Sequence, residues 1–374
     1  MTTDVGLSTM DDPRRRSFEV VERKGLGHPD TICDALAERL SAALCRFYLD
    51  RFGSILHHNV DKVLLRGGAA APRFGGGEVT EPIEIYFAGR ATASFRGVDV
   101  PIADLANQVA REFFRETFHT LDVERHVRVH CLIRPGSIDL VDLFMRQRQS
   151  GVWLANDSSI GVGFAPLSGT ERAVLAVDRA LRDSQTRVDH PAFGEDLKIL
   201  AVRRGSRTDM TVACAFCDRH VPDAATYLAE KAQLSAIAER AAGGGFGILV
   251  NAADDPATGT FYLTVTGTSA EAGDDGEVGR GNRINGLITP CRPMTLEAPA
   301  GKNPVSHVGK LYNVAARGIA EAIVSEIPEI DAAECYLSSR IGQQVGEPHF
   351  VELRLAAGAQ PPAAFRKRVE PIVA

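Results

Sequence analysis

The strongest constraint on the fold is an alternation of strand-type runs and helical segments that occurs three times along the chain. In the first third, apolar residues recur every four positions from Ile32 to Tyr48, and this spacing predicts a helix from Pro29 to about Phe52. Strand-type runs follow this helix at residues 60–67, 81–92 and 127–134.

The middle and last thirds repeat the alternation. A glycine run at 243–247 ends a long alanine-rich segment, because glycine breaks a helix and adopts positive φ. We expect helices over 171–183, about 222–242 and about 308–327, and strands over 197–205, 209–217, 247–253, 260–269, 334–341 and 349–355.

This pattern predicts an α+β protein of three related units. The 374 residues exceed what one small core needs, and no long Pro- or Ser-rich linker separates the thirds, which favours tightly packed domains. The boundaries are placed at 1–148, 149–265 and 266–374, with interleaving allowed.

Charge and composition exclude several classes of protein. The formal net charge of −6 gives no basic field for nucleic acid or an anionic membrane, and no aromatic-basic stripe appears. No apolar run of about 18 residues or secretory leader is visible. Seven scattered cysteines fit the reduced thiols of a cytoplasmic protein, and the Cys214–Cys217 pair is interpreted as buried strand residues.

The hexapeptide GLGHPD at 25–30 is the first polar cluster. Pro29 suits the first turn of a helix, whose N-terminus presents unpaired amides to an anion. A nucleotide site with Asp30 on a metal is one interpretation, and a plain helix cap is the other.

Three further clusters carry small polar, acidic and basic side chains. They lie at 137–139 with 156–163, at 273–283 and at 300–310. For 137–139 with 156–163 the structural alternative is ordinary turns, and for 300–310 it is a solvated basic face. The stretch 273–283 is open between a metal site and a phosphate site. Neither a GxxxxGK[ST] loop nor a GxGxxG after a strand is present, but carboxylates for Mg²⁺ with Lys, Arg and His for phosphate are what ATP chemistry requires.

At these residues the sequence resembles the archaeal-type S-adenosylmethionine synthetases (methionine adenosyltransferases). The resemblance covers most of the chain. Its stretches are VERKGLGHPDTICD (21–34), FGSILHHNVDKVLL (52–65), PRFGGGEV (72–79), GSIDLVDLF (136–144), LANDSSIGVGFAPLSGTER (154–172), GEDLKILAVRRG (194–205) and the long run from TGTSAEAGDDGEVGRGNR to GKNPVSHVGKLYN (266–313).

The resemblance implies three α+β domains related by a pseudo-threefold axis. It implies that the sulfur of L-methionine attacks C5′ of ATP to give S-adenosylmethionine, and that the triphosphate is hydrolysed to pyrophosphate and phosphate. It also implies two Mg²⁺ ions per site and a homodimer with active sites between subunits, leaving a higher oligomer open.

Roles carry over to single positions. The resemblance assigns catalysis to His28, Lys198, Arg280 and Lys302; ATP and phosphate binding to Gly136, Ser137, Asp139 and His307; methionine binding to Asp157 and Asp274; and metal binding to Asp30 and Asp274.

Two regions depart from the family pattern. Arg134 and Pro135 stand where archaeal members usually read GQ, and Pro135 fixes φ and removes a donor, so we expect a differently shaped loop. The region of the bacterial potassium-binding glutamate reads His57-His58-Asn59, which leaves K⁺ dependence open. A non-catalytic ATP-binding paralogue and an adenosyltransferase for a methionine analogue are the alternative functions.

Overall fold

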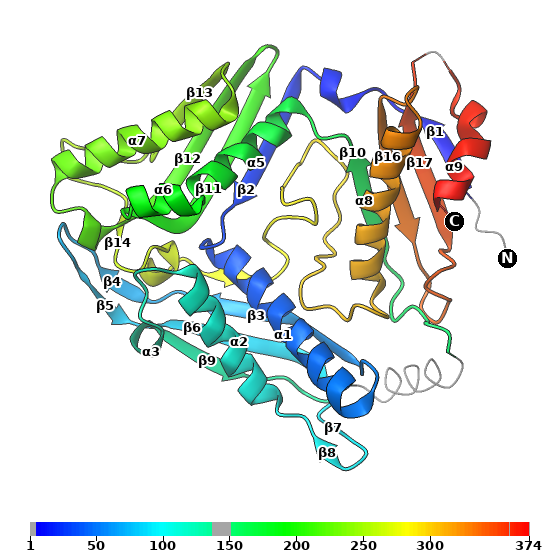
Figure 1. Cartoon of the computed structure of the whole chain (residues 1–374), viewed down its shortest axis with the longest axis horizontal. Coiled ribbons are helices and arrows are strands. Elements are labelled where there is room, and N and C mark those ends of the chain that lie inside the picture. Colours follow the sequence, from blue (N-terminus) through cyan, green and yellow to red (C-terminus); the bar gives the residue numbers. More distant parts are fainter. Residues whose placement is uncertain (1–4, 137–150, 359, 374) are drawn as a thin grey trace.

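The computed structural model describes residues 5–136, 151–358 and 360–373. Over these residues the strands form three larger sheets and two small hairpins, and each larger sheet has its own helices and its own apolar core. Figure 1 shows the three units around the middle of the molecule. This agrees with the three α+β units expected from the sequence.

The first sheet has the order β15-β3-β6-β9 and is covered by α1 and α2. Helix α1 begins with Pro29 in its first turn and ends at Gly53, whose φ is +70°. Its every-fourth apolar residues are buried against β3 and β6. The elements are α1 (Pro29–Phe52), β3 (His58–Arg66), β6 (Ile83–Ala91), α2 (Ile102–Thr117), α3 (Val123–His126), β9 (Val127–Cys131) and β15 (Gly276–Glu277), with the hairpins β4 (Ala69–Ala71) and β5 (Glu78–Glu81), and β7 (Ser94–Phe95) and β8 (Val98–Asp99).

The second sheet has the order β13-β12-β11-β2 and packs against α5 and α7. Cys214 and Cys217 are buried strand residues of β12, as predicted. Only Leu263–Thr264 of the run 260–269 forms a strand, β14, so that prediction was mostly wrong. The elements are β2 (Phe18–Lys24), α5 (Gly169–Leu181), α6 (Ser184–Asp189), β11 (Phe193–Arg204), β12 (Arg207–Cys217), α7 (Ala224–Ala242) and β13 (Phe246–Val250).

The third sheet has the order β1-β17-β16-β10 and carries α8 and α9. Its first strand, β1, pairs in parallel with the last strand, β17, so that the two ends of the chain meet in one sheet. The elements are β1 (Val5–Thr9), β10 (Ile160–Ala165), α8 (Val308–Glu326), β16 (Ala332–Ser338), β17 (Phe350–Ala356) and α9 (Arg366–Val373).

The units interleave in sequence. β1 and β2 lie in the first third but join the third and second sheets, and β15 returns from residue 276 to pair with β3. The contiguous ranges 1–148, 149–265 and 266–374 therefore do not coincide with the sheets. Sheet partners are chosen by tertiary packing, which the order of residues does not reveal.

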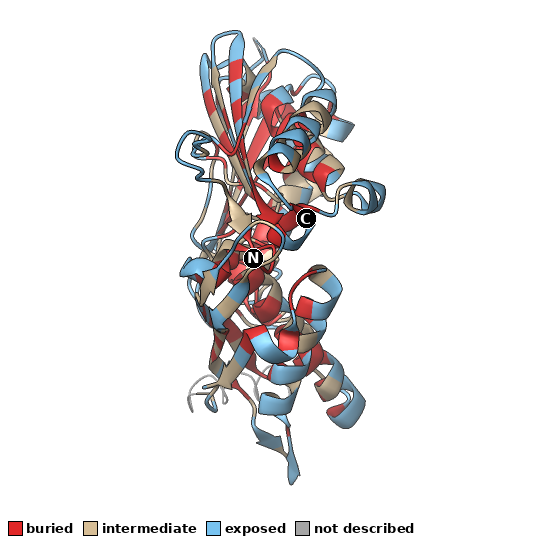
Figure 2. Cartoon of the chain, turned by 90° about the vertical axis from the view of Figure 1, so that its left-hand side faces the viewer, coloured by how far each residue is buried: buried red, intermediate tan, exposed pale blue. Residues whose placement is uncertain are grey.

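The helices and the sheets form two layers, and the turned view in Figure 2 shows strands along one side and most helices along the other. Along β11, Leu197 and Ile199 are buried, whereas Lys198 and Leu200 point to the other face. Leu64 on β3 and Leu249 on β13 are likewise exposed. We call this side, away from the helices, the open sheet face.

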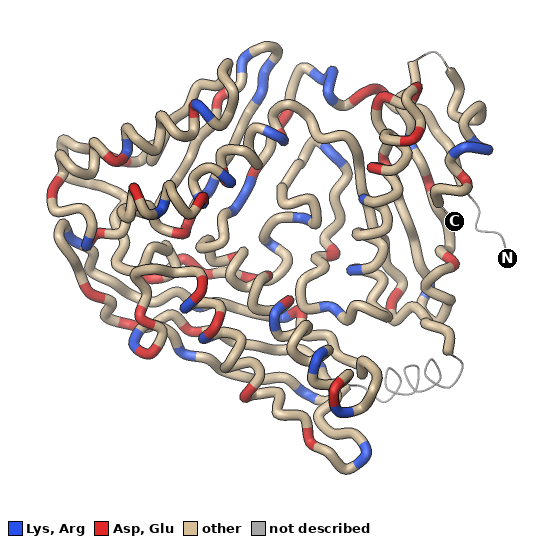
Figure 3. The backbone as a smooth tube through the Cα atoms, viewed as in Figure 1, with Lys and Arg blue, Asp and Glu red and all other residues tan. Residues whose placement is uncertain are grey.

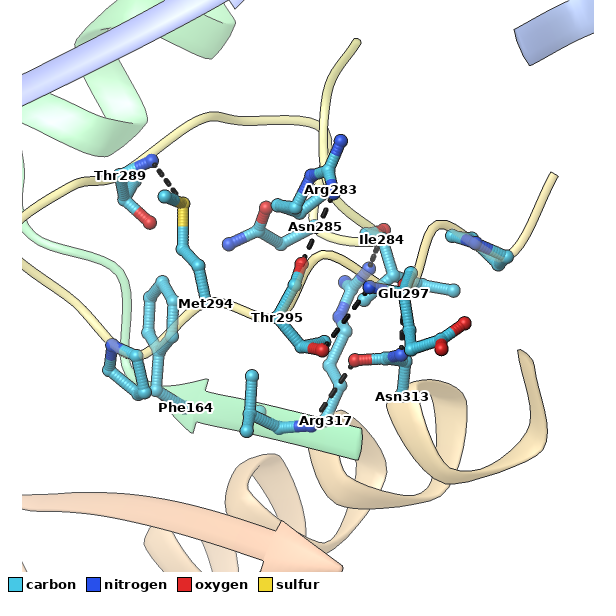
Figure 4. Close-up of a pocket in the computed structure, with 14 residues that line it drawn as sticks. Phe164, Arg283, Ile284, Asn285, Thr289, Met294, Thr295, Glu297, Asn313 and Arg317 are labelled. Atoms are coloured by element: carbon cyan, nitrogen blue, oxygen red, sulfur yellow. Dashed lines mark hydrogen bonds between the residues drawn. The ribbon is translucent and has the colours of Figure 1, made fainter. Parts of the chain in front are cut away.

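Residues 278–307 contain no helix or strand and are named the central segment. Side chains fix this segment against β10 and α8 around a small cavity of about 30 Å³ (Figure 4). Arg283 donates to the carbonyl of Thr295 at 3.2 Å, Asn313 to that of Glu297 at 3.1 Å and Arg317 to that of Ile284 at 3.0 Å. These bonds replace the missing backbone ladders.

Candidate active site

A cavity of about 700 Å³ lies where the first two sheets meet the start of α1. We call it the His28 cavity. It is lined by Lys24, His28, Asp30, Leu64, Asp196, Lys198, Ala213, Tyr262, Ser269, Gly273, Asp274, Asp275, Gly276, Glu277 and Arg280. Leu64, Lys198 and Ala213 project from the open sheet face, so the cavity opens on that side.

His28 occupies the N-cap of α1, and its Nδ1 accepts the backbone N–H of Asp30 at 3.2 Å. Burial, followed by the nearby charge of Lys24, lowers the pKa of His28 to about 4. The ring is therefore neutral at physiological pH. Because Nδ1 is an acceptor, the proton lies on Nε2, which makes His28 a neutral hydrogen-bond donor.

Asp30 is buried beside His28. Its Oδ2 accepts from Lys24 Nζ at 2.8 Å and its Oδ1 from the backbone N–H of Glu277 at 2.9 Å. Burial acts to raise the pKa of Asp30, but the bonds from Lys24 and Glu277 outweigh burial and leave it below its ordinary value. The carboxylate is therefore charged and fixed in position.

Asp196, Ser269 and Asp274 form an acidic group on another wall of the cavity. The Ser269 hydroxyl lies 2.5 Å from Asp196 Oδ2 and 2.9 Å from Asp274 Oδ2. Burial raises the pKa of Asp196 to about 7, although the bonds from Ser269 oppose it. Ser269 has one hydroxyl hydrogen, so a proton held on Asp196 accounts for the second short contact.

Lys198 and Arg280 supply mobile positive charge to the cavity. The Lys198 ammonium lies 3.5 Å from Glu22, and the Arg280 side chain is 70% exposed, with Nε 3.9 Å from Asp30 Oδ1. Both side chains are long and partly solvated, so they can turn toward an anion. Arg280 follows the tight contact of Gly276 with Pro29, where an added Cβ would lie 2.3 Å from the Pro29 carbonyl carbon.

Five of the predicted site residues meet in this cavity: His28, Asp30, Lys198, Asp274 and Arg280. The structure adds lining residues that sequence reasoning missed, among them Lys24, Asp196 and Ser269. One signal for Asp196 was available, because it lies two positions before Lys198 in a strand. The signal for Lys24 was its place just before the glycines of GLGHPD.

Lys302 and His307 form a separate group at the start of α8. The Lys302 ammonium is buried between Asp61 Oδ2 at 3.0 Å and Glu297 Oε2 at 3.2 Å. His307 caps α8, with Nδ1 accepting from Gly309 N at 3.2 Å, and burial followed by Lys302 lowers its pKa to about 3. In the chain as folded this group does not line the His28 cavity.

The remaining predicted residues lie elsewhere. Asp157 is exposed before β10, and its carboxylate accepts from the backbone of Ser158 at 2.8 Å. Gly136 ends the described stretch after Arg134, which bridges to Arg90. Ser137 and Asp139 lie outside the described residues. His58, in the region considered for K⁺, is buried with its Nε2 2.8 Å from the Ser41 hydroxyl.

Figure 3 shows charges of both signs spread over all three units, and the described residues form no continuous stripe of one sign. Among the described residues, no helix is long and apolar enough to cross a membrane. The cavity itself holds three lysine or arginine side chains and five carboxyl groups. Lysine and arginine side chains beside carboxylates suit an anionic ligand that arrives with its own metal ions.

Comparison with known proteins gives a consistent result. A family model for S-adenosylmethionine synthetase (AdoMet synthetase) matches residues 4–374. The chain is 52% identical to a probable S-adenosylmethionine synthase of Aquifex aeolicus over 93% of this chain and 88% of that protein. It is 48% identical to the S-adenosylmethionine synthase of Pyrococcus furiosus over 89% and 84% of the two chains.

The fold also matches a solved structure. An S-adenosylmethionine synthetase from Campylobacter jejuni, described as unusual, superposes with a TM-score of 0.63 at 15% identity. The match covers 95% of this chain and 88% of the other. At this identity the likeness concerns the fold alone.

Proposed function

Because the chain belongs to the S-adenosylmethionine synthetase family, we propose that the His28 cavity is where it transfers the adenosyl group of ATP to methionine. The protein is a methionine adenosyltransferase that makes S-adenosylmethionine from ATP and L-methionine. The observation that carries the proposal is that His28, Asp30, Lys198, Asp274 and Arg280 line one cavity.

The main chemical demand is the negative charge that develops on the departing triphosphate. His28 carries its proton on Nε2 and donates it as a hydrogen bond to the oxygen that leaves C5′. A neutral imidazole keeps this geometry over the physiological pH range, because its pKa is about 4. Lys198 and Arg280 stabilise the phosphate oxygens with positive charge.

The nucleophile needs less help. The thioether sulfur of methionine is neutral and attacks without losing a proton, so no general base is required for this step. Placement of sulfur, C5′ and the leaving oxygen in line is then the main contribution of the protein. We propose Asp157 and Asp274 as the carboxylates that bind the methionine.

We propose that the triphosphate is hydrolysed to pyrophosphate and phosphate before release. Lys302 and His307, with Gly136, Ser137 and Asp139, are the proposed phosphate and nucleotide ligands on this route. Lys302 is held by Asp61 and Glu297 in the structure, so its ammonium reaches a phosphate only after exchanging one of these partners.

The donor set of the cavity fits Mg²⁺. Carboxyl groups outnumber the lysine and arginine side chains there, and oxygen ligands are those that Mg²⁺ prefers. Asp274 and Asp30 are the proposed ligands, with two ions per site. When bound there, Mg²⁺ would supply positive charge that offsets the negative charge of the phosphate groups. Asp274 is exposed to the cavity, whereas Asp30 is already paired with Lys24.

We also propose a homodimer that closes the cavity. The cavity opens on the open sheet face, where Leu64, Leu200 and Leu249 are exposed. A second copy packed on this face would bury these leucines and exclude water from the substrates.

The free cysteines of the described residues suit a reducing compartment, and we propose a cytoplasmic location.

The assembly has a direct test. Leu249→Asp places a charge on the open sheet face, and Leu228→Asp places one on exposed α7 as a matched control. Light scattering after gel filtration should give a smaller species for the first variant alone. If both variants keep the wild-type mass, the open sheet face is not the interface.

The catalytic role is tested by Arg280→Ala, with Arg207→Ala as the control. Arg207 is 80% exposed and lies at the tip of the β11–β12 hairpin. With ATP, methionine and Mg²⁺, the first variant should form S-adenosylmethionine at least ~100-fold more slowly, and the control should match the wild type. Normal turnover by Arg280→Ala would remove the His28 cavity as the phosphate site.

A further inference from the structure

Lys24 is a cavity residue to which nothing above gives a role in the reaction. It ends β2, opposite Lys198 of β11, and its residue surface is 8% exposed. Its ammonium donates to Asp30 Oδ2 at 2.8 Å and to the backbone carbonyl of Arg280 at 2.8 Å.

The backbone of Lys24 is held as firmly as its side chain. Its N–H donates to Asn282 Oδ1 at 3.0 Å, and its carbonyl accepts from Asn282 Nδ2 at 2.8 Å. Lys24 therefore joins three segments, namely the end of β2, the start of α1 and the beginning of the central segment. Both the backbone and the ammonium of Lys24 are thus held by hydrogen bonds within the cavity wall.

The consequence for Asp30 is that its charge is already matched. Lys24 holds Oδ2, and the Glu277 amide holds Oδ1 at 2.9 Å. A divalent cation that approached Asp30 would meet the Lys24 ammonium at close range, and like charges repel strongly in a partly buried site.

Asp274 offers a different environment. Its Oδ2 accepts from the Ser269 hydroxyl, and among the described residues no lysine or arginine pairs with it. A cation can therefore bind at Asp274 without displacing a resident charge. The two proposed metal ligands therefore differ in whether a lysine already holds the carboxylate.

We propose that Lys24 is a positioning residue that makes metal binding at Asp30 depend on the substrate. In the protein without substrate, Lys24 holds the Asp30 carboxylate in position and keeps it closed to a divalent ion. The negative polyphosphate of the substrate offsets the charge of Lys24, and the ion then enters with the substrate rather than before it. This inference rests on the proposed function of the cavity.

The same ammonium acts on Arg280. By accepting from Lys24, the Arg280 carbonyl fixes the backbone from which the guanidinium reaches into the cavity. Lys24 thus controls metal binding at Asp30 and also fixes the backbone of Arg280, the proposed phosphate-binding arginine.

The test measures Mn²⁺ binding by electron paramagnetic resonance in the protein without nucleotide. Lys24→Gln keeps a hydrogen-bond donor and removes the charge, Lys24→Met removes both, and Lys24→Arg keeps the charge. The first two should bind Mn²⁺ at least ~10-fold more tightly than the wild type, and Lys24→Arg should not. Added inorganic tripolyphosphate should reduce the difference in Mn²⁺ affinity between these two variants and the wild type.

A gain in affinity separates this role from simple support of the fold, because a damaged fold binds metal less well. The gain should vanish in the double variant Lys24→Gln with Asp30→Asn, which shows that it occurs at Asp30. Unchanged or weaker Mn²⁺ binding by folded Lys24→Gln and Lys24→Met overturns the inference. Failure of both variants to fold, seen as loss of cooperative thermal unfolding, overturns it as well.

A failure of the proposed function would look different. Asp274→Asn should weaken Mn²⁺ binding in the wild-type background. If Asp274→Asn has no effect, the metal site of the cavity is wrong. If Asp274→Asn weakens binding and Lys24→Gln leaves it unchanged, only the role of Lys24 is wrong.

Discussion

The N-termini of α1 and α8 have the same local arrangement, but only the N-terminus of α1 lies at the His28 cavity. Each is capped by a histidine, His28 or His307, whose Nδ1 accepts the backbone N–H two residues later at 3.2 Å. Each has a lysine paired with an aspartate nearby, Lys24 with Asp30 and Lys302 with Asp61. Yet His28 and Asp30 at the start of α1 line a cavity of about 700 Å³. Lys302 and His307 at the start of α8 are buried and do not line that cavity.

The difference teaches that basic residues at a helix start do not by themselves make an anion site. At α8 the protein supplies its own carboxylates, Asp61 and Glu297, and these occupy Lys302. At α1 the exposed cations Lys198 and Arg280 are left to meet a ligand. The two sites are thus distinguished by what packs opposite each helix start.

The largest expected effect tests the site at the start of α8, where Asp61 and Glu297 enclose Lys302. Lys302→Met leaves Asp61 and Glu297 without their buried partner and should lower the free energy of unfolding by about 3–5 kcal/mol. Lys62→Met is the matched control, since Lys62 contacts the same Asp61 but is 65% exposed, and it should cost less than about 1 kcal/mol. Urea unfolding measures both, and equal losses would show that the α8 site is not closed.

The next effect tests the open site. His28→Asn keeps an N-cap, because asparagine also accepts backbone N–H groups, but removes the Nε2 donor. Turnover should fall about 100-fold or more, with the free energy of unfolding nearly unchanged. His307→Asn should slow turnover less. If His307→Asn slowed turnover more than His28→Asn, the α8 cap rather than the α1 cap would lie at the reaction site.

The smallest effect concerns acid stability. Burial lowers the pKa of His307 to about 3 in the folded protein, while Lys302, Asp61, Lys62 and Lys310 face it. The unfolded chain therefore binds the proton first, and stability falls as pH drops below about 6.5.

For His307 this loss amounts to about 2 kcal/mol between roughly pH 7 and pH 5. His307→Asn should remove that part of the pH dependence, measured by urea unfolding at each pH. A variant whose stability falls as steeply as that of the wild type would show that His307 does not stay neutral.

The sequence allowed α1 to be predicted, because Pro29 and the four-residue apolar spacing are both local signals. The predicted strand over 260–269 was mostly wrong for a physical reason. Buried Glu271 accepts from the backbone of Val265 and Thr266, and this side-chain pairing replaces a strand partner.

The site was predictable only in part. His28, Asp30 and Arg280 lie in motifs with distinct chemistry, and they meet in the cavity. Nothing local shows that Lys302 is enclosed by Glu297, since this contact depends on how the central segment packs. Tertiary packing also decided the interleaving of the sheets.

The parallel pairing of β1 with β17 has a consequence for biosynthesis. A ribosome releases β1 long before it releases β17, its hydrogen-bonding partner. The third sheet therefore cannot be completed until β17 has emerged, although β3, β6 and β9 can assemble with α1 earlier. During that interval β1 has an unpaired edge, and chaperones that shield such edges are expected to matter more for the yield of this protein than its final stability suggests.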